Sequence, residues 1–405
     1  MKKIFLLTLY CLAFHLHAQE DSKPNTADFK LDDQGLSFSF NEGAYQFNIN
    51  GFVQPSIVNE KIDGQEAENR FNAKRAFFII GGKAVKEKVS FLIQSDYNLA
   101  KPMMDAWVAY HPYEWLTITG GQKQTFVNNR EMTYREDRLQ FTERGQLSTL
   151  FSKTGREFGL FFEGKFGEKI GIRPKFAITS GDGRNSFGAD SRDADFGGMK
   201  IGGRLDIYPL GNFKEGNDLY TADLAHESTL KILLGVAASK NIGATDAVGE
   251  GHGNFLFYDN AGKISDIDYN QIYADVLMKY DGFSLLAEYA NATASNLGLA
   301  FLDETATSIL APQQISSFFA IGNSFSLQSG YVTRNGLSFD VRYENTTPEF
   351  SDNLSSILPD SNSYTLGITK YFKSNNLKMQ AAFTNIDYAN NTKMTMAEFM
   401  VQIGF

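Results

Sequence analysis

Alternation between apolar and polar residues recurs along most of this 405-residue chain, and it constrains the fold more than any other feature. In the segment 337–344 the residues follow the order Leu337, Ser338, Phe339, Asp340, Val341, Arg342, Tyr343 and Glu344. Successive side chains of a strand point to opposite sides, so this strand has one apolar face and one charged face. A strand buried on both faces would not carry three charges, so the pattern predicts lipid on one side and an aqueous interior on the other.

Sixteen segments of the chain fit strands of this kind. Their approximate ranges are 44–58, 70–86, 88–98, 103–111, 115–126, 155–166, 170–181, 196–208, 230–240, 267–281, 283–292, 316–331, 336–345, 362–373, 376–388 and 394–405. Short turns such as 86–88 and 281–282 alternate with long loops, which is typical of barrels whose two rims face different compartments. We therefore expect an all-β fold, a transmembrane antiparallel β-barrel of about 16 strands over residues 44–405.

The N-terminal part of the chain is expected to lie outside this barrel. Residues 1–18 combine Lys2 and Lys3 with an apolar run and end on Ala18, which is the pattern of a cleavable secretory signal. Residues 19–43 are polar and are interpreted as an N-terminal extension. The single cysteine, Cys11, lies within the signal, so the mature chain needs no disulfide framework.

Composition excludes some functions. The formal net charge is −9, and loss of two lysines with the signal makes the mature chain more negative still, so no general basic surface is available for nucleic acid. Beyond the signal, no apolar run approaches the roughly 18 residues that a membrane-spanning helix needs. The 35 phenylalanines, 36 glycines and only 9 prolines fit a chain made mainly of strands and turns.

Two connections depart from the alternation of short turns and exposed loops. The loop Val127–Thr154 is dense in charges of both signs, namely Arg130, Glu131, Arg135, Glu136, Asp137, Arg138, Glu143, Arg144 and Lys153. The turn Pro209–Thr229 falls on the side of the short turns and yet is long, and the pattern alone gives no reason for it.

Several motifs between residues 44 and 166 occur in a distinctive order. They are Lys74-Arg75-Ala76-Phe77-Phe78, Met104-Asp105-Ala106-Trp107-Val108-Ala109-Tyr110, Gly121-Gln122-Lys123-Gln124, Asn129-Arg130-Glu131, Leu139-Gln140-Phe141-Thr142-Glu143-Arg144 and Gly155-Arg156-Glu157-Phe158-Gly159. In order and spacing they resemble the phosphate-selective porin O and P family, including its Bacteroidetes-type relatives. Shorter similar pieces downstream are Gly203-Arg204-Leu205, Ser363-Tyr364-Thr365-Leu366-Gly367 and the terminal Phe405.

The resemblance implies a 16-stranded porin in the outer membrane of a Gram-negative bacterium, in contact with outer-membrane lipid and usually a homotrimer. It implies that small anionic solutes such as phosphate pass through, and that the third loop, here Val127–Thr154, folds inward and narrows the lumen. It also implies that the outer-membrane assembly machinery recognises Phe405. Basic residues would bind anions at the constriction; the candidates are Arg75, Lys123, Arg130, Arg135, Arg138, Arg144 and Arg156, with Asp105 as an acid that faces the lumen.

Guanidinium groups suit this role because their planar fork matches phosphate oxygens. The same arginines have a structural alternative, which is ion pairing with the four acids of the loop, Glu131, Glu136, Asp137 and Glu143. Phe77 also stands where the family commonly repeats an arginine. The alternative to an anion-preferring passage is therefore a general porin that is non-selective or prefers cations. Asp105 has the matching alternative of pairing with a basic residue of the wall.

Other function classes have weaker support. His111, His226 and His252 lie far apart in sequence, and neither a Gly-x-Ser-x-Gly elbow nor a His-Glu-x-x-His pair is present, so we expect no enzyme and no cofactor. The acidic stretch Asp182–Asp195 lacks the spacing of a calcium loop, so no metal is expected. A further alternative is a plugged barrel whose long loops, Asn241–Asp266 and Asn291–Gln314, bind partners at the cell surface.

Overall fold

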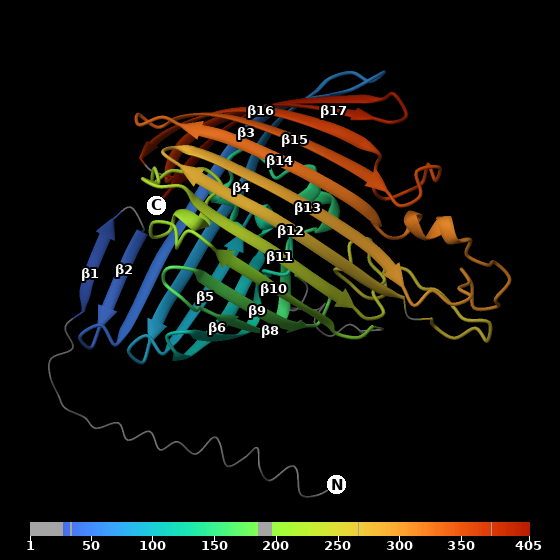
Figure 1. Ribbon diagram of the computed structural model, residues 1–405, viewed down its shortest axis with the longest axis horizontal. Helices are drawn as coiled ribbons and strands as arrows, with labels where there is room; N and C mark the ends of the chain where they lie inside the picture. The colour runs from blue at the N-terminus through green and yellow to red at the C-terminus, as the bar shows by residue number, and fades with distance from the viewer. Residues whose placement is uncertain (1–26, 33–34, 185–196, 266, 374) are drawn as a thin grey trace, which may run out of the picture.

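Sixteen antiparallel strands close into a barrel in the computed structural model, which describes residues 27–32, 35–184, 197–265, 267–373 and 375–405 (Figure 1). Consecutive strands pair all the way round, and the last strand, β18, pairs with the first strand of the barrel, β3, for example at Phe399 and Ile57. Closure leaves the barrel without a free edge. The prediction of an all-β barrel of about 16 strands is confirmed.

The strands of the barrel match most of the predicted ranges. Their bounds are β3 (Tyr45–Ile62), β4 (Glu68–Ala84), β5 (Val89–Asp96), β6 (Met103–Tyr113), β7 (Leu116–Gln124), β8 (Arg156–Gly164), β9 (Gly171–Thr179), β10 (Lys200–Tyr208), β11 (Lys231–Asn241), β12 (Asp268–Tyr280), β13 (Phe283–Ser295), β14 (Gly322–Val332), β15 (Leu337–Pro348), β16 (Ser361–Lys373), β17 (Leu377–Tyr388) and β18 (Lys393–Gly404). The described residues contain no helix that is long and apolar enough to cross a membrane.

One predicted strand start is wrong. The range 316–331 was expected to be a single strand, but β14 begins at Gly322, and the short helix η5 (Pro312–Ser317) overlaps the first residues of that range. Ile315 and Phe319 are buried in an apolar cluster formed by the long loops, so the apolar residues before Gly322 serve loop packing. Pro312 at the start of η5 suits the first turn of a helix, where its missing N–H has no partner to lose.

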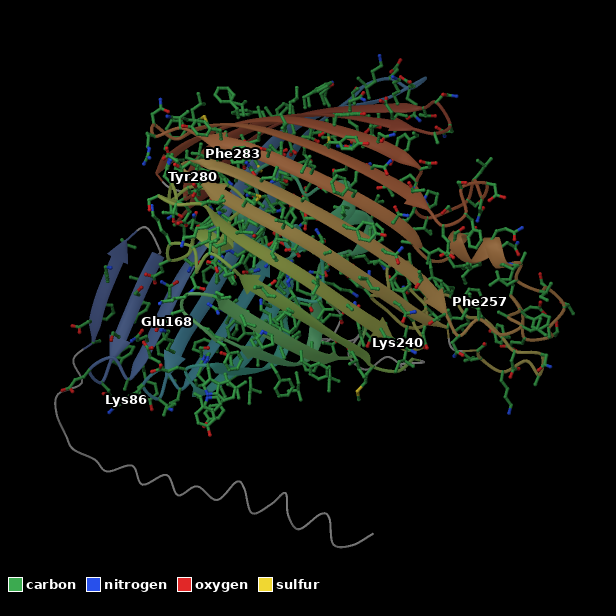
Figure 2. All side chains as sticks on the ribbon, in the orientation of Figure 1. Lys86, Glu168, Lys240, Phe257, Tyr280 and Phe283 are labelled. Atoms are coloured by element: carbon green, nitrogen blue, oxygen red, sulfur yellow. The ribbon has the colours of Figure 1, made fainter. Side chains whose placement is uncertain are left out.

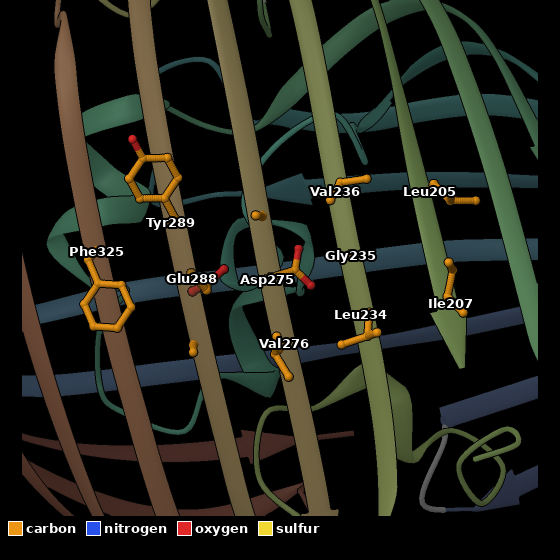
Figure 3. Close-up of a pocket in the computed structure, with 12 residues that line it drawn as sticks. Leu205, Ile207, Leu234, Gly235, Val236, Asp275, Val276, Glu288, Tyr289 and Phe325 are labelled. Carbon is orange, nitrogen blue, oxygen red and sulfur yellow. The ribbon is translucent and has the colours of Figure 1, made fainter. Parts of the chain in front are cut away.

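The two faces of the sheet differ as the alternation predicts. On β15, Phe339 and Val341 are 55% and 52% exposed on the outside, whereas Asp340 and Glu344 are buried on the inside. The outside also has a groove of about 400 Å³ across β10 to β14, lined mainly by apolar side chains such as Leu205, Val236, Ala274, Tyr289 and Phe325 (Figure 3). The outer surface is therefore apolar and the inner surface polar.

The two ends of the barrel also differ. Lys86, Glu168 and Tyr280 mark the end with short turns, which we call the turn end, and Lys240 and Phe257 mark the opposite, loop end (Figure 2). The long loops pack together and against Tyr269 of β12 through buried apolar side chains, among them Phe257, Ile315, Phe319 and Leu358. The alternation of short and long connections predicted from the sequence is present.

A hairpin precedes the barrel. Strands β1 (Asp28–Asp32) and β2 (Gly35–Phe40) were not predicted as strands, and β2 pairs with the first residues of β3, from Tyr45 to Ile49. β18 pairs with β3 only from Phe52 onward, so the hairpin continues the sheet beyond the last barrel strand at the turn end (Figure 1). The predicted signal, residues 1–18, lies outside the described residues.

Candidate functional site

The loop between β7 and β8 folds into the lumen, as predicted for Val127–Thr154, and we call these residues the inserted loop. It contains α1 (Arg130–Thr133), η2 (Glu136–Arg138) and α2 (Gln146–Phe151), which lie inside the barrel (Figure 1). Most of its side chains are buried, including charged ones that a solvated loop would expose. Buried charges need partners, so the contacts of this loop determine what the site can do.

Glycines of the barrel wall leave the space that the inserted loop occupies. A Cβ on Gly235 of β11 would lie 2.5 Å from a guanidinium nitrogen of Arg130, and one on Gly330 of β14 would lie 2.0 Å from the amide nitrogen of Gln140. Both distances are shorter than van der Waals contact. The wall and the loop are thus complementary in shape, and a larger residue at either glycine would displace the loop.

The first anchor of the loop is a buried cluster of charges against β10 and β12. Arg130 contacts Asp206 and donates from Nε to Asp275 at 2.9 Å. Arg204 of the wall donates to Asp206 at 2.8 Å and also contacts Asp275, and Lys175 lies 3.0 Å from Asp206. Gly235 on the intervening β11 pairs with Asp275 and makes room for the cluster (Figure 3). The positive charge of Arg130 is therefore balanced by the carboxylates of Asp206 and Asp275.

The second anchor joins the loop to β13 and β15. Glu131 of α1 forms an ion pair with Arg342 at 3.0 Å, and its backbone N–H donates to Glu288 at 2.9 Å. Glu344 accepts hydrogen bonds from the backbone N–H groups of Gln146 (2.9 Å) and Leu147 (3.0 Å), the first residues of α2. These contacts satisfy helix N–H groups that have no partner within their own helix.

A third group of charges lies where the loop returns to the wall. Glu136 accepts from Arg156 at 2.7 Å and from Arg144 at 3.2 Å. Burial opposes ionisation of Glu136, but the two arginines outweigh it and hold the pKa of its carboxyl far below the ordinary range. Asp105 lies on the inner face of β6, 3.5 Å from Nε of Arg156. Arg156 therefore pairs both with Asp105 of the wall and with Glu136 of the inserted loop, and so joins the two.

Two further basic candidates are also paired. Arg75 of β4 lies 2.6 Å from Glu143 of the loop, and Lys74 lies 3.1 Å from the same carboxylate. Burial would raise the pKa of Glu143, but the adjacent Arg75 and Lys74 lower it to about 2. Lys123 of β7 pairs with Glu163 of β8 at 2.6 Å, so its charge is balanced within the wall.

Among the predicted residues, Arg138 at the tip of the inserted loop is the exception to this ion pairing in the described part of the chain. Arg135 forms a two-point ion pair with Asp137, at 2.6 Å and 2.8 Å, and Lys378 of β17 donates to the Asp137 carbonyl at 2.9 Å. Arg138 forms no ion pair within the described part of the chain, and its guanidinium carbon lies 5.5 Å from the centre of the Tyr220 ring. Its Nε is buried without a hydrogen-bond partner.

The structure thus brings all eight predicted residues to the lumen and its wall, and pairs seven of them with opposite charges. Sequence reasoning missed wall residues that hold the loop, among them Asp206, Asp275, Glu288 and Lys378. Each of them is buried on the inner face of its strand. A charged residue at an inward position of an alternating strand is the signal that could have identified them.

The three histidines considered for catalysis lie in separate surroundings. His111 contacts the hydroxyls of Ser90 (2.8 Å) and Thr117 (3.1 Å), and it forms no ion pair with a carboxylate among the described residues. His252 pairs with Asp182 at 2.7 Å near the loop end, and His226 lies on the turn between β10 and β11. Within the described ranges, no group of three or more His, Cys, Asp or Glu residues is arranged to hold a metal ion; the predicted acidic stretch lies partly outside those ranges.

Comparisons with known proteins show the fold. No family model and no curated protein matches the sequence. Among solved structures, the chain is similar to OmpF of Salmonella typhi in complex with daunomycin, with 12% identity, a TM-score of 0.54, and coverage of 93% of this chain and 100% of that one. It is also similar to an anion-selective porin from Comamonas acidovorans, with 10% identity, a TM-score of 0.53, and coverage of 89% and 100%.

A third similar structure is the outer membrane channel DcaP of Acinetobacter baumannii, with 11% identity, a TM-score of 0.53, and coverage of 90% of this chain and 99% of that one. The Comamonas acidovorans protein is described as a porin, and the Acinetobacter baumannii protein is described as an outer membrane channel. The chain therefore has the fold of these three proteins over nearly its whole described length.

Proposed function

We propose that this protein is an outer-membrane porin of a Gram-negative bacterium through which small solutes, anions such as phosphate among them, diffuse passively. The observation that carries the proposal is the inserted loop, held by ion pairs across a polar lumen inside a barrel with an apolar outside. An apolar outer band and a polar interior suit a barrel that spans lipid and encloses water. The similarity in fold to an anion-selective porin supports the same assignment.

Three finer assignments belong to this proposal. The motif resemblance supports an assignment of the chain to the phosphate-selective porin O and P family. That resemblance also favours a homotrimer, and one similar structure, OmpT of Vibrio cholerae, is described as a trimer form. The terminal Phe405, which is 56% exposed at the turn end, would be recognised by the outer-membrane assembly machinery.

Anion preference would depend on the balance of fixed charges along the passage. Because Arg75, Arg130, Arg144 and Arg156 are paired with acids, they contribute mainly to holding the loop. Arg138 is the cation of the inserted loop without an acidic partner in the described residues, so we assign to it the largest part of any preference for anions. Arg135, which is 28% exposed although paired, contributes less.

The test is the reversal potential of the purified, folded protein in planar bilayers under a chloride gradient, with and without phosphate. Variants Arg130→Ala, Arg135→Ala and Arg138→Ala are compared with Arg334→Ala, which removes an exposed arginine from a turn. We expect an anion-selective current that phosphate inhibits and that Arg138→Ala weakens most. A cation-selective or unselective current would remove the anion assignment, and no current from folded protein would contradict the porin.

A plugged barrel that binds partners at its loop end is the second candidate function. It is favoured by the burial of the inserted loop and by apolar side chains exposed on the long loops, including Leu299 (64%), Ile309 (56%) and Leu354 (96%). The two candidates differ in conductance. A correctly folded barrel that carries no current in any condition would favour the binding function over transport.

A further inference from the structure

The hairpin β1–β2 has one apolar face and one polar face. Successive side chains of a strand alternate between its two faces. The apolar face consists of the large side chains that share one side of both strands, namely Phe29, Leu31, Leu36, Phe38 and Phe40. The opposite face is polar and includes Asp28, Lys30, Ser37 and Ser39. The hairpin is therefore amphipathic, although the sequence predicts only a polar extension at residues 19–43.

The apolar face of the hairpin joins the outer surface of the barrel. Phe38 of β2 lies directly opposite Phe47 of β3, which is 37% exposed on the outside of the barrel. The ring of Phe47 also contacts Phe40 of β2, at 6.2 Å between centroids, and Phe91 of β5, at 5.8 Å. Aromatic contacts thus run without a break from β2 onto the barrel wall. The hairpin continues the surface that the barrel presents to lipid.

The outermost part of this face is exposed. Figure 1 shows the hairpin beyond β3 at the turn end, with β1 as its outermost strand. Phe29 and Leu31 of β1 are 66% and 80% exposed, and the ring of Phe29 contacts that of Phe38 at 5.3 Å. Contact of a continuous apolar surface with water is unfavourable, and such a surface marks a place of interaction. We therefore looked for a partner that fits both faces of the hairpin.

The charges of β1 favour a lipid surface over a second copy of the chain. A strand edge within hydrocarbon would leave backbone polar groups without partners, whereas at the level of the head groups water meets that edge. Asp28 and Lys30, on the polar face of the outermost strand, suit this level. In a second copy, antiparallel pairing of the two β1 strands centred on Lys30 would place Lys30 opposite Lys30. Like charges directly opposite each other destabilise a strand pair.

We propose that the β1–β2 hairpin is a membrane-surface anchor. Its apolar face lies in the phospholipid leaflet at the turn end, at the boundary between head groups and acyl chains, and its polar face meets water. The contact holds β2 against the first residues of β3, from Tyr45 to Ile49, which lie beyond the pairing of β3 with β18. The anchor thus extends the lipid-contacting surface past the seam where the barrel closes. It does not depend on whether the barrel carries current.

Fluorescent labels at single cysteines test the anchor, because Cys11 is the only cysteine of the chain. In a Cys11→Ser background, Leu31→Cys on the apolar face and Lys30→Cys on the polar face are labelled with a nitrobenzoxadiazole dye. Val341→Cys, on the outside of β15, is the lipid reference. Barrels whose heat-modifiable gel mobility shows folding are reconstituted at low density in vesicles of phosphatidylethanolamine and phosphatidylglycerol. Quenching is measured with iodide on both sides of the membrane, and separately with lipids that carry a doxyl group near the head group or near the chain end.

We expect the shallow doxyl lipid to quench the label at Leu31, and iodide to quench it at least about fivefold less than the label at Lys30. A label at Phe29→Cys, on the same face as Leu31, should behave in the same way. Equal quenching of the Leu31 and Lys30 labels by iodide, without quenching by doxyl lipid, would overturn the anchor. Protection of the Leu31 label from both quenchers would show that protein covers the face, and would also contradict contact with lipid.

Discussion

Asp206 is the residue whose loss should release the inserted loop most clearly. Its carboxylate contacts Arg130, Lys175 and Arg204, and all four side chains are on the inner side of the barrel. In Asp206→Ala, Arg130 and Arg204 share the remaining acid, Asp275, and Lys175 loses its ion pair with residue 206. Removing one partner of a buried pair destabilises by about 3–5 kcal/mol. About 3 kcal/mol corresponds to roughly a hundredfold rise in the population of the detached loop.

Limited trypsin digestion of the folded barrel measures this population, because detachment exposes the arginines of the loop. Asp281→Ala is the matched control, since Asp281 pairs with Arg334 and their side chains are 52% and 73% exposed. An exposed pair contributes about 0–1 kcal/mol, so the control should change cleavage by less than about fivefold. If Asp206→Ala is cleaved within fivefold of the wild type, the ion-pair cluster does not hold the loop.

Three other outcomes follow from the same contacts. Because the pKa of Glu143 is lowered, its ion pairs are fully present above the ordinary value of 4.5 and are lost as the pH falls toward about 2. Hydrogen exchange of the inserted loop should therefore rise as the pH falls through this window. Glu143→Gln should abolish this dependence of exchange on pH. Gly330→Val should displace Gln140 and raise trypsin cleavage of the loop, whereas Gly298→Val, at an exposed position with open space between β13 and β14, should not. Deleting Phe405 should slow membrane assembly in cells, measured as the folded fraction by heat-modifiable gel mobility; normal assembly would contradict its role.

Most strands of the barrel were predictable because the alternation of apolar and polar residues can be recognised within each strand alone. A strand between lipid and water alternates every second residue, and β15 shows this without reference to any other element. The strand at Gly322 was misplaced because Ile315 and Phe319 are apolar for a different reason, which is packing between loops. The hairpin β1–β2 was missed although its residues alternate between apolar and polar, because its strands have only five and six residues.

The site was predictable in part. Charge density in the loop Val127–Thr154 indicated a segment that contacts other charges, and the acids of the loop include Asp137 and Glu136, the partners of Arg135 and Arg144. The partners across the lumen, such as Asp275 and Arg342, are set by the pairing and closure of distant strands, which a single sequence does not specify. The long turn Pro209–Thr229 could not be interpreted from the sequence. Its carbonyl groups accept hydrogen bonds from Lys279 of β12, and that contact depends on how distant strands pair.

The passage is tested most directly by comparing the single-channel conductance of the wild type with that of a barrel in which residues 131–149 are replaced by a short Gly-Ser linker. We expect a small, steady conductance for the wild type and a conductance several times larger for the loop-deleted barrel. No current from the folded wild type, or equal conductance of the two proteins, would contradict a passage narrowed by the inserted loop.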